Sequence, residues 1–196
     1  MKKVIPSGSV LVPSEASLVF KGKIFDVYQW PQQLYDGSSR TFEMLKRTDT
    51  VSVICVTNEK IIVIDDEQPH LGQRKSFPGG RVDHEDASIE DAAKREILEE
   101  TGYSFKNWRL IKVSQPQRKI EWFVYVFIAW EQISKVAPNL DAGEKITARE
   151  IELNELKSLI NSATDYLGES VDIFSRVNSI PELLQTPEFK GTSVER

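Results

Sequence analysis

The chain has 196 residues, of which 40% are apolar and 28% are charged, with a net charge of -5 and a pI near 5.2. This composition is typical of a globular protein with one core, and it excludes an extensively disordered chain. The acidic balance argues against nucleic acid as a partner, no run is apolar enough to cross a membrane, and the lone Cys55 excludes an internal disulfide framework. With no signal peptide after Met1, we expect a cytoplasmic protein.

The first 47 residues have a strand-like pattern. Apolar runs at Leu18–Phe20, Ile24–Trp30 and Thr41–Leu45 predict three strands, and Asp36-Gly37 predicts a hairpin turn between the last two. A sheet this thin is not stable alone, so it must pack on the rest of the chain or on a second copy. We therefore predict a β extension over residues 1–47 that forms a dimer, followed by a main domain over residues 48–196.

Further strands and helices are expected along the main domain. The predicted strands are Val51–Val56, Ile61–Ile64, Leu110–Val113 and Trp122–Ala129, with a turn at Asn58–Lys60. The predicted helices are Ala87–Thr101, Glu152–Ile160 and two short pieces at 171–177 and 181–184. Because strands and helices do not alternate regularly, the fold class is α/β of the mixed α+β kind.

The helix expected over residues 87–101 has recognisable ends and a buried side. Ser88 with Asp91 forms a capping pair, and Gly102 is placed to end the helix in a left-handed conformation. An apolar stripe is formed by Ile89, Ala92, Ala93 and Ile97. The i, i+4 spacing also predicts two ion pairs, Glu90–Lys94 and Asp91–Arg95.

Three glutamates stand together in the last turns of this helix. Glu96, Glu99 and Glu100 are spaced i, i+3 and i+4, so their carboxylates share one side. Like charges near a helix C-terminus repel one another and oppose the helix dipole, whereas Mg²⁺ or Mn²⁺ would neutralise them. The spacing alone is equally compatible with a solvated acidic face. The preceding Pro78-Gly79-Gly80 lets the backbone approach a phosphate or a metal ion closely.

Together these residues resemble the Nudix box. Arg95-Glu96-Ile97-Leu98-Glu99-Glu100-Thr101-Gly102-Tyr103 matches its second half at every defined position, and Pro78-Gly79-Gly80 resembles its entry, with Gly80 as the box glycine. From Gly80 to Arg95 there is one residue more than in the pattern. The first box glutamate is therefore replaced by Glu85 or by Asp86.

The resemblance implies an α/β/α sandwich around a mixed sheet and a metal-dependent hydrolase of diphosphate linkages. It implies Mg²⁺, or Mn²⁺, bound by Glu96, Glu100 and the carbonyl of Gly79. Glu99 would complete the cluster and Arg95 would orient a glutamate through an ion pair. The metal ions would draw charge from the phosphates and activate a water molecule.

The N-terminal strands make the chain similar to the ADP-ribose and ADP-sugar pyrophosphatase branch, whose members share this region across a homodimer. The branch implies AMP and a sugar phosphate as products, a base-stacking aromatic (Tyr28 or Trp30), and a general base, Glu144, in the loop Leu140–Ile146. The expected substrate-binding cations are Arg47, Arg81 and Arg118, and Lys119, Arg74 and Lys75 are further candidates for phosphate contacts.

Other interpretations of these residues remain open. Trp30 can equally pack at an interface, and Glu144 can be an exposed acid in a turn. Two segments differ from the sequence pattern that is usual in this branch, namely the entry Phe77-Pro-Gly-Gly and the segment Gln115–Lys119. One alternative is a Nudix hydrolase with another substrate, either a GDP- or UDP-sugar or a damaged nucleoside triphosphate. The other is a non-catalytic module that senses a nucleotide.

Overall fold

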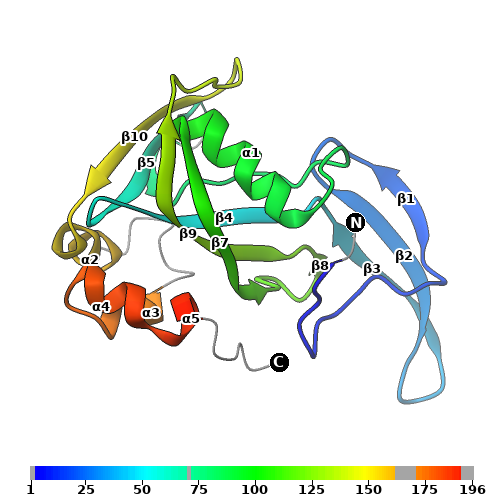
Figure 1. The fold of residues 1–196 in the computed structure, drawn as a ribbon. Helices are drawn as coiled ribbons and strands as arrows, with labels where there is room; N and C mark the ends of the chain where they lie inside the picture. The colour runs from blue at the N-terminus through cyan, green and yellow to red at the C-terminus, as the bar shows by residue number, and fades with distance from the viewer. Residues whose placement is uncertain (1–2, 70–71, 162–170, 191–196) are drawn as a thin grey trace.

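The structure is a computed structural model that describes residues 3–69, 72–161 and 171–190 (Figure 1). Its strands are β1 Ser17–Lys21, β2 Asp26–Gln33, β3 Ser39–Lys46, β4 Thr50–Thr57, β5 Lys60–Gln68, β6 Gly72–Ser76, β7 Tyr103–Ser114, β8 Ile120–Glu121, β9 Val124–Lys135 and β10 Lys145–Ile151. Its helices are α1 Ile89–Thr101, α2 Leu153–Asn161, α3 Val171–Ser175, α4 Ile180–Gln185 and α5 Pro187–Lys190.

A mixed sheet forms the centre of the main domain. Its strand order is β10-β5-β4-β9-β7, with β6 added on β5, and β4 pairs with β9 in parallel. Successive side chains of a strand point to opposite faces, so β4 contributes to two apolar clusters. Ile54 and Val56 belong to one cluster, and Val53 and Cys55 belong to the other.

Helices cover both faces of this sheet. On one face α1 buries the predicted stripe of Ile89, Ala92, Ala93 and Ile97, all at most 8% exposed. On the other face α2 to α5 bury apolar side chains such as Leu156, Phe174 and Leu183. The layers are therefore helix, sheet and helices, which confirms the predicted sandwich and the mixed α+β class.

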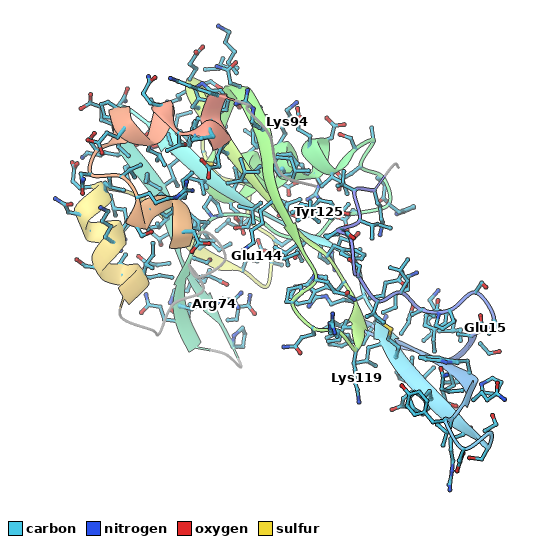
Figure 2. All side chains as sticks on the ribbon, turned by 90° about the horizontal axis from the view of Figure 1, so that it is seen from below. Glu15, Arg74, Lys94, Lys119, Tyr125 and Glu144 are labelled. Atoms are coloured by element: carbon cyan, nitrogen blue, oxygen red, sulfur yellow. The ribbon has the colours of Figure 1, made fainter. Side chains whose placement is uncertain are left out.

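The N-terminal strands form a second sheet that projects away from this body (Figures 1 and 2). Its order is β1-β2-β3-β8. The predicted hairpin is confirmed, since β2 and β3 pair from Asp26 with Lys46 to Gln33 with Ser39, around the turn that holds Gly37. All five residues of β1 are exposed.

The N-terminal arm ahead of β1 lies against the main domain. Lys3 forms an ion pair with the buried Asp49 at 2.6 Å, and the Tyr125 hydroxyl donates to the Val4 carbonyl at 3.1 Å. The Gln115 side chain exchanges two hydrogen bonds with the backbone of Val10. These contacts fix the arm across the junction between the two sheets.

Several expectations need correction. β6 and β10 were not predicted, and β7 and β9 are longer than predicted. The predicted pair Asp91–Arg95 is wrong: the Asp91 carboxylate accepts from the Ser88 hydroxyl, and Arg95 turns toward the loop before α1. The pair Glu90–Lys94 is confirmed at 2.6 Å. Among the described helices, none is long and apolar enough to cross a membrane.

Candidate active site

Local interactions fix both ends of α1. The Ser88 side chain accepts from the Asp91 N–H at 3.1 Å, as predicted for the N-cap. Gly102 adopts φ +74°, and its N–H donates to the Leu98 carbonyl at 3.0 Å. The glutamates in the last two turns therefore have defined positions relative to the sheet.

The loop that precedes α1 is attached to the central strand β4. The N–H groups of Val51 and Val53 donate to the carbonyls of Gly80 and Pro78, both at 2.9 Å. Between these two bonds Gly79 adopts φ +147°, and a Cβ there would lie 2.2 Å from the Val51 carbonyl oxygen. Only glycine fits this position without moving the loop or the strand.

Glu96 and Glu100 face this loop. The Gly79 N–H donates to Glu100 Oε2 at 2.7 Å. A Cβ on Gly80 would lie 2.4 Å from Glu96 Oε2, so the missing side chain makes room for that carboxylate. Glu100 is 6% exposed and the Glu96 side chain is 12% exposed. The glycine loop and the helix thus enclose the buried carboxylate of Glu100 and the largely buried one of Glu96.

Burial dominates the electrostatics of this pair. It raises the pKa of Glu96 to about 7, where Arg95 acts in the opposite direction and the charges of Glu99 and Glu144 add to the rise. Burial also raises the pKa of Glu100 well above its ordinary value, against the hydrogen bond from Gly79 and together with the charges of Glu96, Glu144 and Asp66. Both groups would be stabilised in their ionised form by a nearby cation.

Arg95 holds the loop carboxylate, and that carboxylate belongs to Asp86. Arg95 Nε and Nη2 donate to the two oxygens of Asp86, both at 3.0 Å, and this pairing lowers the pKa of Asp86. Glu85 has a 72% exposed side chain and pairs with the exposed His84. Asp86, rather than Glu85, therefore stands where the first box glutamate was expected.

Arg95 also binds two of the helical glutamates. Its Nη1 donates to Glu96 Oε1 and to Glu99 Oε2, both at 3.0 Å. The Glu99 side chain is 40% exposed, so it lies at the rim, whereas the other two glutamates face the loop. The three carboxylates are adjacent, but they do not share one environment.

Glu144 lies on the exposed loop between β9 and β10 (Figure 2). Its Oε2 accepts from the Asp141 N–H at 3.2 Å, which closes a turn. Its charge is near enough to raise the pKa of both Glu96 and Glu100. The structure therefore brings this residue toward the carboxylate pair across some 45 residues of sequence.

Arg47 and Arg81 form a cationic group beside the loop. The Arg47 guanidinium lies 4.8 Å from the Trp122 ring centroid and 5.5 Å from that of Phe25. Its Nε is buried and has no hydrogen-bond partner within the described ranges. Burial, followed by the charge of Arg81, lowers the pKa of Arg47. Arg81 is exposed and pairs with Asp83 at 3.6 Å.

The other expected cations have different surroundings. Arg118 and Lys119 are exposed on the turn before β8, and Figure 2 shows Lys119 toward the projecting sheet. Lys75 pairs with Asp65 at 3.4 Å. Arg74 pairs at 2.6 Å with the buried Asp66, whose charge raises the pKa of Glu100. Arg74 is thus linked to the carboxylate pair through Asp66.

Tyr28 and Trp30 lie on β2 in the projecting sheet. Lys46 lies 6.0 Å from the Tyr28 ring centroid, and Trp30 packs against Phe42 with ring centroids 6.3 Å apart. None of these partners belongs to α1 or its loop. Within one chain, the structure does not bring either ring to the carboxylates.

The oxygen donors fit Mg²⁺ or Mn²⁺ bound partly by water and substrate. Among the described residues no three Asp, Glu, His or Cys side chains gather closely enough to hold a metal ion by themselves. Mg²⁺ commonly uses one or two carboxylates and completes its shell with water and phosphate oxygens. In the described part of the chain the Gly79 carbonyl accepts no hydrogen bond, which leaves one more oxygen donor in the loop that Glu96 and Glu100 face.

Two residues near the site escaped the sequence analysis. Asp66, near the end of β5, is 4% exposed. The signal that could have found it is a pair of acids, Asp65 and Asp66, directly after an apolar run. Tyr103 was expected only as the apolar end of the box, yet its hydroxyl bonds Lys135 and Glu150. A hydroxyl at a position that needs only an apolar side chain was the signal there.

Comparisons with known proteins agree with this geometry. A NUDIX domain profile matches residues 46–169. An ADP-ribose pyrophosphatase of Bacillus subtilis (strain 168) is 30% identical over 155 residues, 76% of this chain and 82% of the relative. A methanol dehydrogenase activator of Bacillus methanolicus is 26% identical over 160 residues, 78% and 84% of the two chains. A solved ADP compounds hydrolase superposes with a TM-score of 0.69 at 18% identity, over 91% of this chain and 97% of the other, which shows a shared fold.

Proposed function

This chain belongs to the Nudix family as a pyrophosphatase, and on that premise we propose that it hydrolyses the diphosphate bond of a nucleoside diphosphate linked to a sugar. The proposed substrate is ADP-ribose or an ADP-sugar, with AMP and a sugar phosphate as products. The observation that carries the proposal is the largely buried pair Glu96 and Glu100, which faces a glycine loop attached to β4. The likeness to an ADP-ribose pyrophosphatase supports the choice of substrate.

The reaction is proposed to need Mg²⁺, for which Mn²⁺ can substitute. Glu96, Glu100 and the Gly79 carbonyl would hold it, with Glu99 completing the cluster at the rim. When bound, the metal ion withdraws charge from the phosphates and lowers the pKa of water. Arg95 contributes by holding Asp86 and Glu96 in fixed positions on either side of the helix–loop junction.

Glu144 is proposed as the general base. It accepts a proton from water as the water oxygen bonds to phosphorus, and the bond from that phosphorus to the bridging oxygen breaks. Its position on an exposed loop allows it to approach a bound substrate. Its charge lies close enough to the carboxylate pair to raise the pKa of both glutamates. The leaving monophosphate carries the bridging oxygen away.

Arg47 and Arg81 are proposed to bind the diphosphate. Arg47 presents a half-buried cation whose Nε lacks a partner among the described residues, and a phosphate oxygen would supply one. Arg118 is proposed as a further contact from the turn before β8. The phosphates would thus lie between the cationic group and the carboxylates.

The chain is proposed to act as a homodimer through its projecting sheet. Residues 1–47 would form this extension and residues 48–196 the hydrolase domain. The sheet exposes apolar side chains that a second copy would cover: Leu18 46%, Val19 51%, Phe20 61% and Phe42 46%. In such a dimer Tyr28 or Trp30 of one subunit would stack on the base bound by the other. The free, buried thiol of Cys55 suits a reducing, cytoplasmic setting.

Product analysis tests the proposal. The purified protein is incubated with ADP-ribose and Mg²⁺, beside Glu100→Gln and the exposed control Glu85→Gln. We expect AMP and ribose 5-phosphate from the native protein and from the control only. Hydrolysis of another nucleotide sugar or of a triphosphate in place of ADP-ribose would refute the substrate. No turnover of any nucleotide with Mg²⁺ or Mn²⁺ would favour a sensor.

A further inference from the structure

The loop that carries Glu144 is fastened to the C-terminal end of α1. The N–H of Val136 donates to the Gly102 carbonyl at 2.8 Å, and the N–H of Asn139 donates to the Glu99 carbonyl at 2.9 Å. The last carbonyls of a helix have no partner within it, and here the Glu99 carbonyl is satisfied by the loop. The loop therefore docks on the same turn that presents Glu99 and Glu100.

Gly102 allows this close approach. A Cβ at Gly102 would lie 2.0 Å from the Val136 carbonyl oxygen. The residue also needs its left-handed conformation to end α1. One glycine thus ends the helix and admits the loop.

The next residue, Tyr103, ties the strands on both sides of the loop. Its ring is buried, 2% exposed, and stacks on Phe105 with centroids 6.2 Å apart. Its hydroxyl donates to the Glu150 carboxylate on β10 and accepts from Lys135 Nζ at 2.6 Å. Lys135 and Glu150 also pair at 3.9 Å. We call Tyr103, Lys135 and Glu150 the clasp.

The clasp joins the strand that precedes the loop of Glu144 to the strand that follows it. Lys135 ends β9 and directly precedes the loop, whereas Glu150 lies near the far end of β10, the strand that begins right after Glu144. Packing requires only an apolar ring at Tyr103, since phenylalanine would fill the same space. The hydroxyl is therefore free of a packing role. One of its partners directly precedes the loop, and the other lies on the strand that follows the loop.

We propose that Tyr103 is a positioning residue, which joins the end of β9, where loop 136–144 begins, to β10, the strand that follows the loop, so that Glu144 stays directed at the carboxylate pair. The role in catalysis rests on the proposed function, in which Glu144 is the base. Tyr103 itself would not touch the substrate. Loss of its hydroxyl would loosen the loop and displace the base, and small displacements of a catalytic group lower turnover strongly.

The first test compares Tyr103→Phe with Tyr125→Phe. Tyr125 is also buried, but its hydroxyl donates to the Val4 carbonyl, and no hydrogen bond among the described residues joins it to the loop. With ADP-ribose and Mg²⁺, we expect kcat to fall about 10-fold in Tyr103→Phe, with KM within about twofold of native. Tyr125→Phe should keep the native kcat. An unchanged kcat in Tyr103→Phe would overturn the proposal.

A double-mutant cycle with Glu144→Gln then asks whether Tyr103 acts through the base. If it does, the variant carrying both substitutions has the same kcat as Glu144→Gln alone. Losses that multiply would show that Tyr103 acts elsewhere and would overturn the proposal. Tyr103→Phe should also melt within a few degrees of Tyr125→Phe.

Hydrogen exchange of the loop separates this inference from the proposed function. The amides of Val136 and Asn139, measured without substrate, should exchange at least about 10-fold faster in Tyr103→Phe than in the native protein or Tyr125→Phe. Unchanged exchange overturns the clasp even if the enzyme is active. If the native protein turns over no nucleotide, or Glu144→Gln is fully active, the proposed function fails, while this readout still decides whether Tyr103 positions the loop.

Discussion

Replacement of Gly79 by alanine should destabilise the fold more than the same replacement at Gly37 or Gly143. At φ +147° an L side chain costs roughly 1–3 kcal/mol, and its Cβ would meet the Val51 carbonyl oxygen at 2.2 Å. Relief of that clash separates the loop from β4 and weakens the bonds Val51 to Gly80 and Val53 to Pro78, each worth about 1 kcal/mol. The sum is about 3–5 kcal/mol, or a fall in Tm of about 10 °C for a chain of this size.

Thermal denaturation followed by circular dichroism measures this effect against the two matched glycines. Gly37 has φ +82°, and a Cβ there would meet no atom of the described residues within 4 Å, so Gly37→Ala reports the cost of the backbone conformation alone, about 1 kcal/mol. Gly143 has the same open space without a left-handed φ, so Gly143→Ala should change Tm by at most about 1 °C. If Gly79→Ala melts together with Gly37→Ala, the inferred contact between loop and strand is wrong.

Three other perturbations test the site and the projecting sheet. Asp86→Asn should lower the free energy of unfolding in urea by about 2–3 kcal/mol, and Glu85→Gln by less than about 0.5 kcal/mol; equal effects would reverse the assignment of the loop acid. In metal-free protein the pKa of Glu96 is raised to about 7, so the folded state favours its protonated form. The free energy of unfolding should therefore fall as pH rises from about 4.5 through 7. Glu96→Gln should flatten this part of the pH–Tm profile. Phe20→Glu should convert a dimer into a monomer by light scattering, whereas the similarly exposed Ile133→Glu should not; a dimer in both variants would exclude the projecting sheet as the interface.

Elements with a strong local pattern were predictable from the sequence. The stripe and caps of α1 lie within one segment, so Ser88, Ile97 and Gly102 identify the helix without any distant contact. β6 and β10 have polar sequences, Gly-Gln-Arg-Lys-Ser and Lys-Ile-Thr-Ala-Arg-Glu-Ile, and they become strands because they pair with the buried β5. A partner far along the chain decides their structure, and a local pattern cannot reveal it.

The candidate site divides in the same way. Glu96 and Glu100 were identified because they stand at fixed spacings on one helix. The choice between Glu85 and Asp86 could not be made from spacing, because an inserted residue leaves the direction of each side chain open; the exposed fraction of Glu85 and the two bonds from Arg95 to Asp86 decide it. The clasp joins residues up to 47 positions apart, so only the folded chain brings them together.

The attachment of the glycine loop to β4 also bears on how the molecule loses its structure. β4 supplies side chains to both apolar clusters and backbone N–H groups to the loop. A segment bound to a central, mostly buried strand opens by local fluctuation less readily than the projecting sheet, with its exposed β1. In this protein the carboxylate centre should thus belong to the slowest-exchanging cooperative unit and persist until the domain unfolds as a whole.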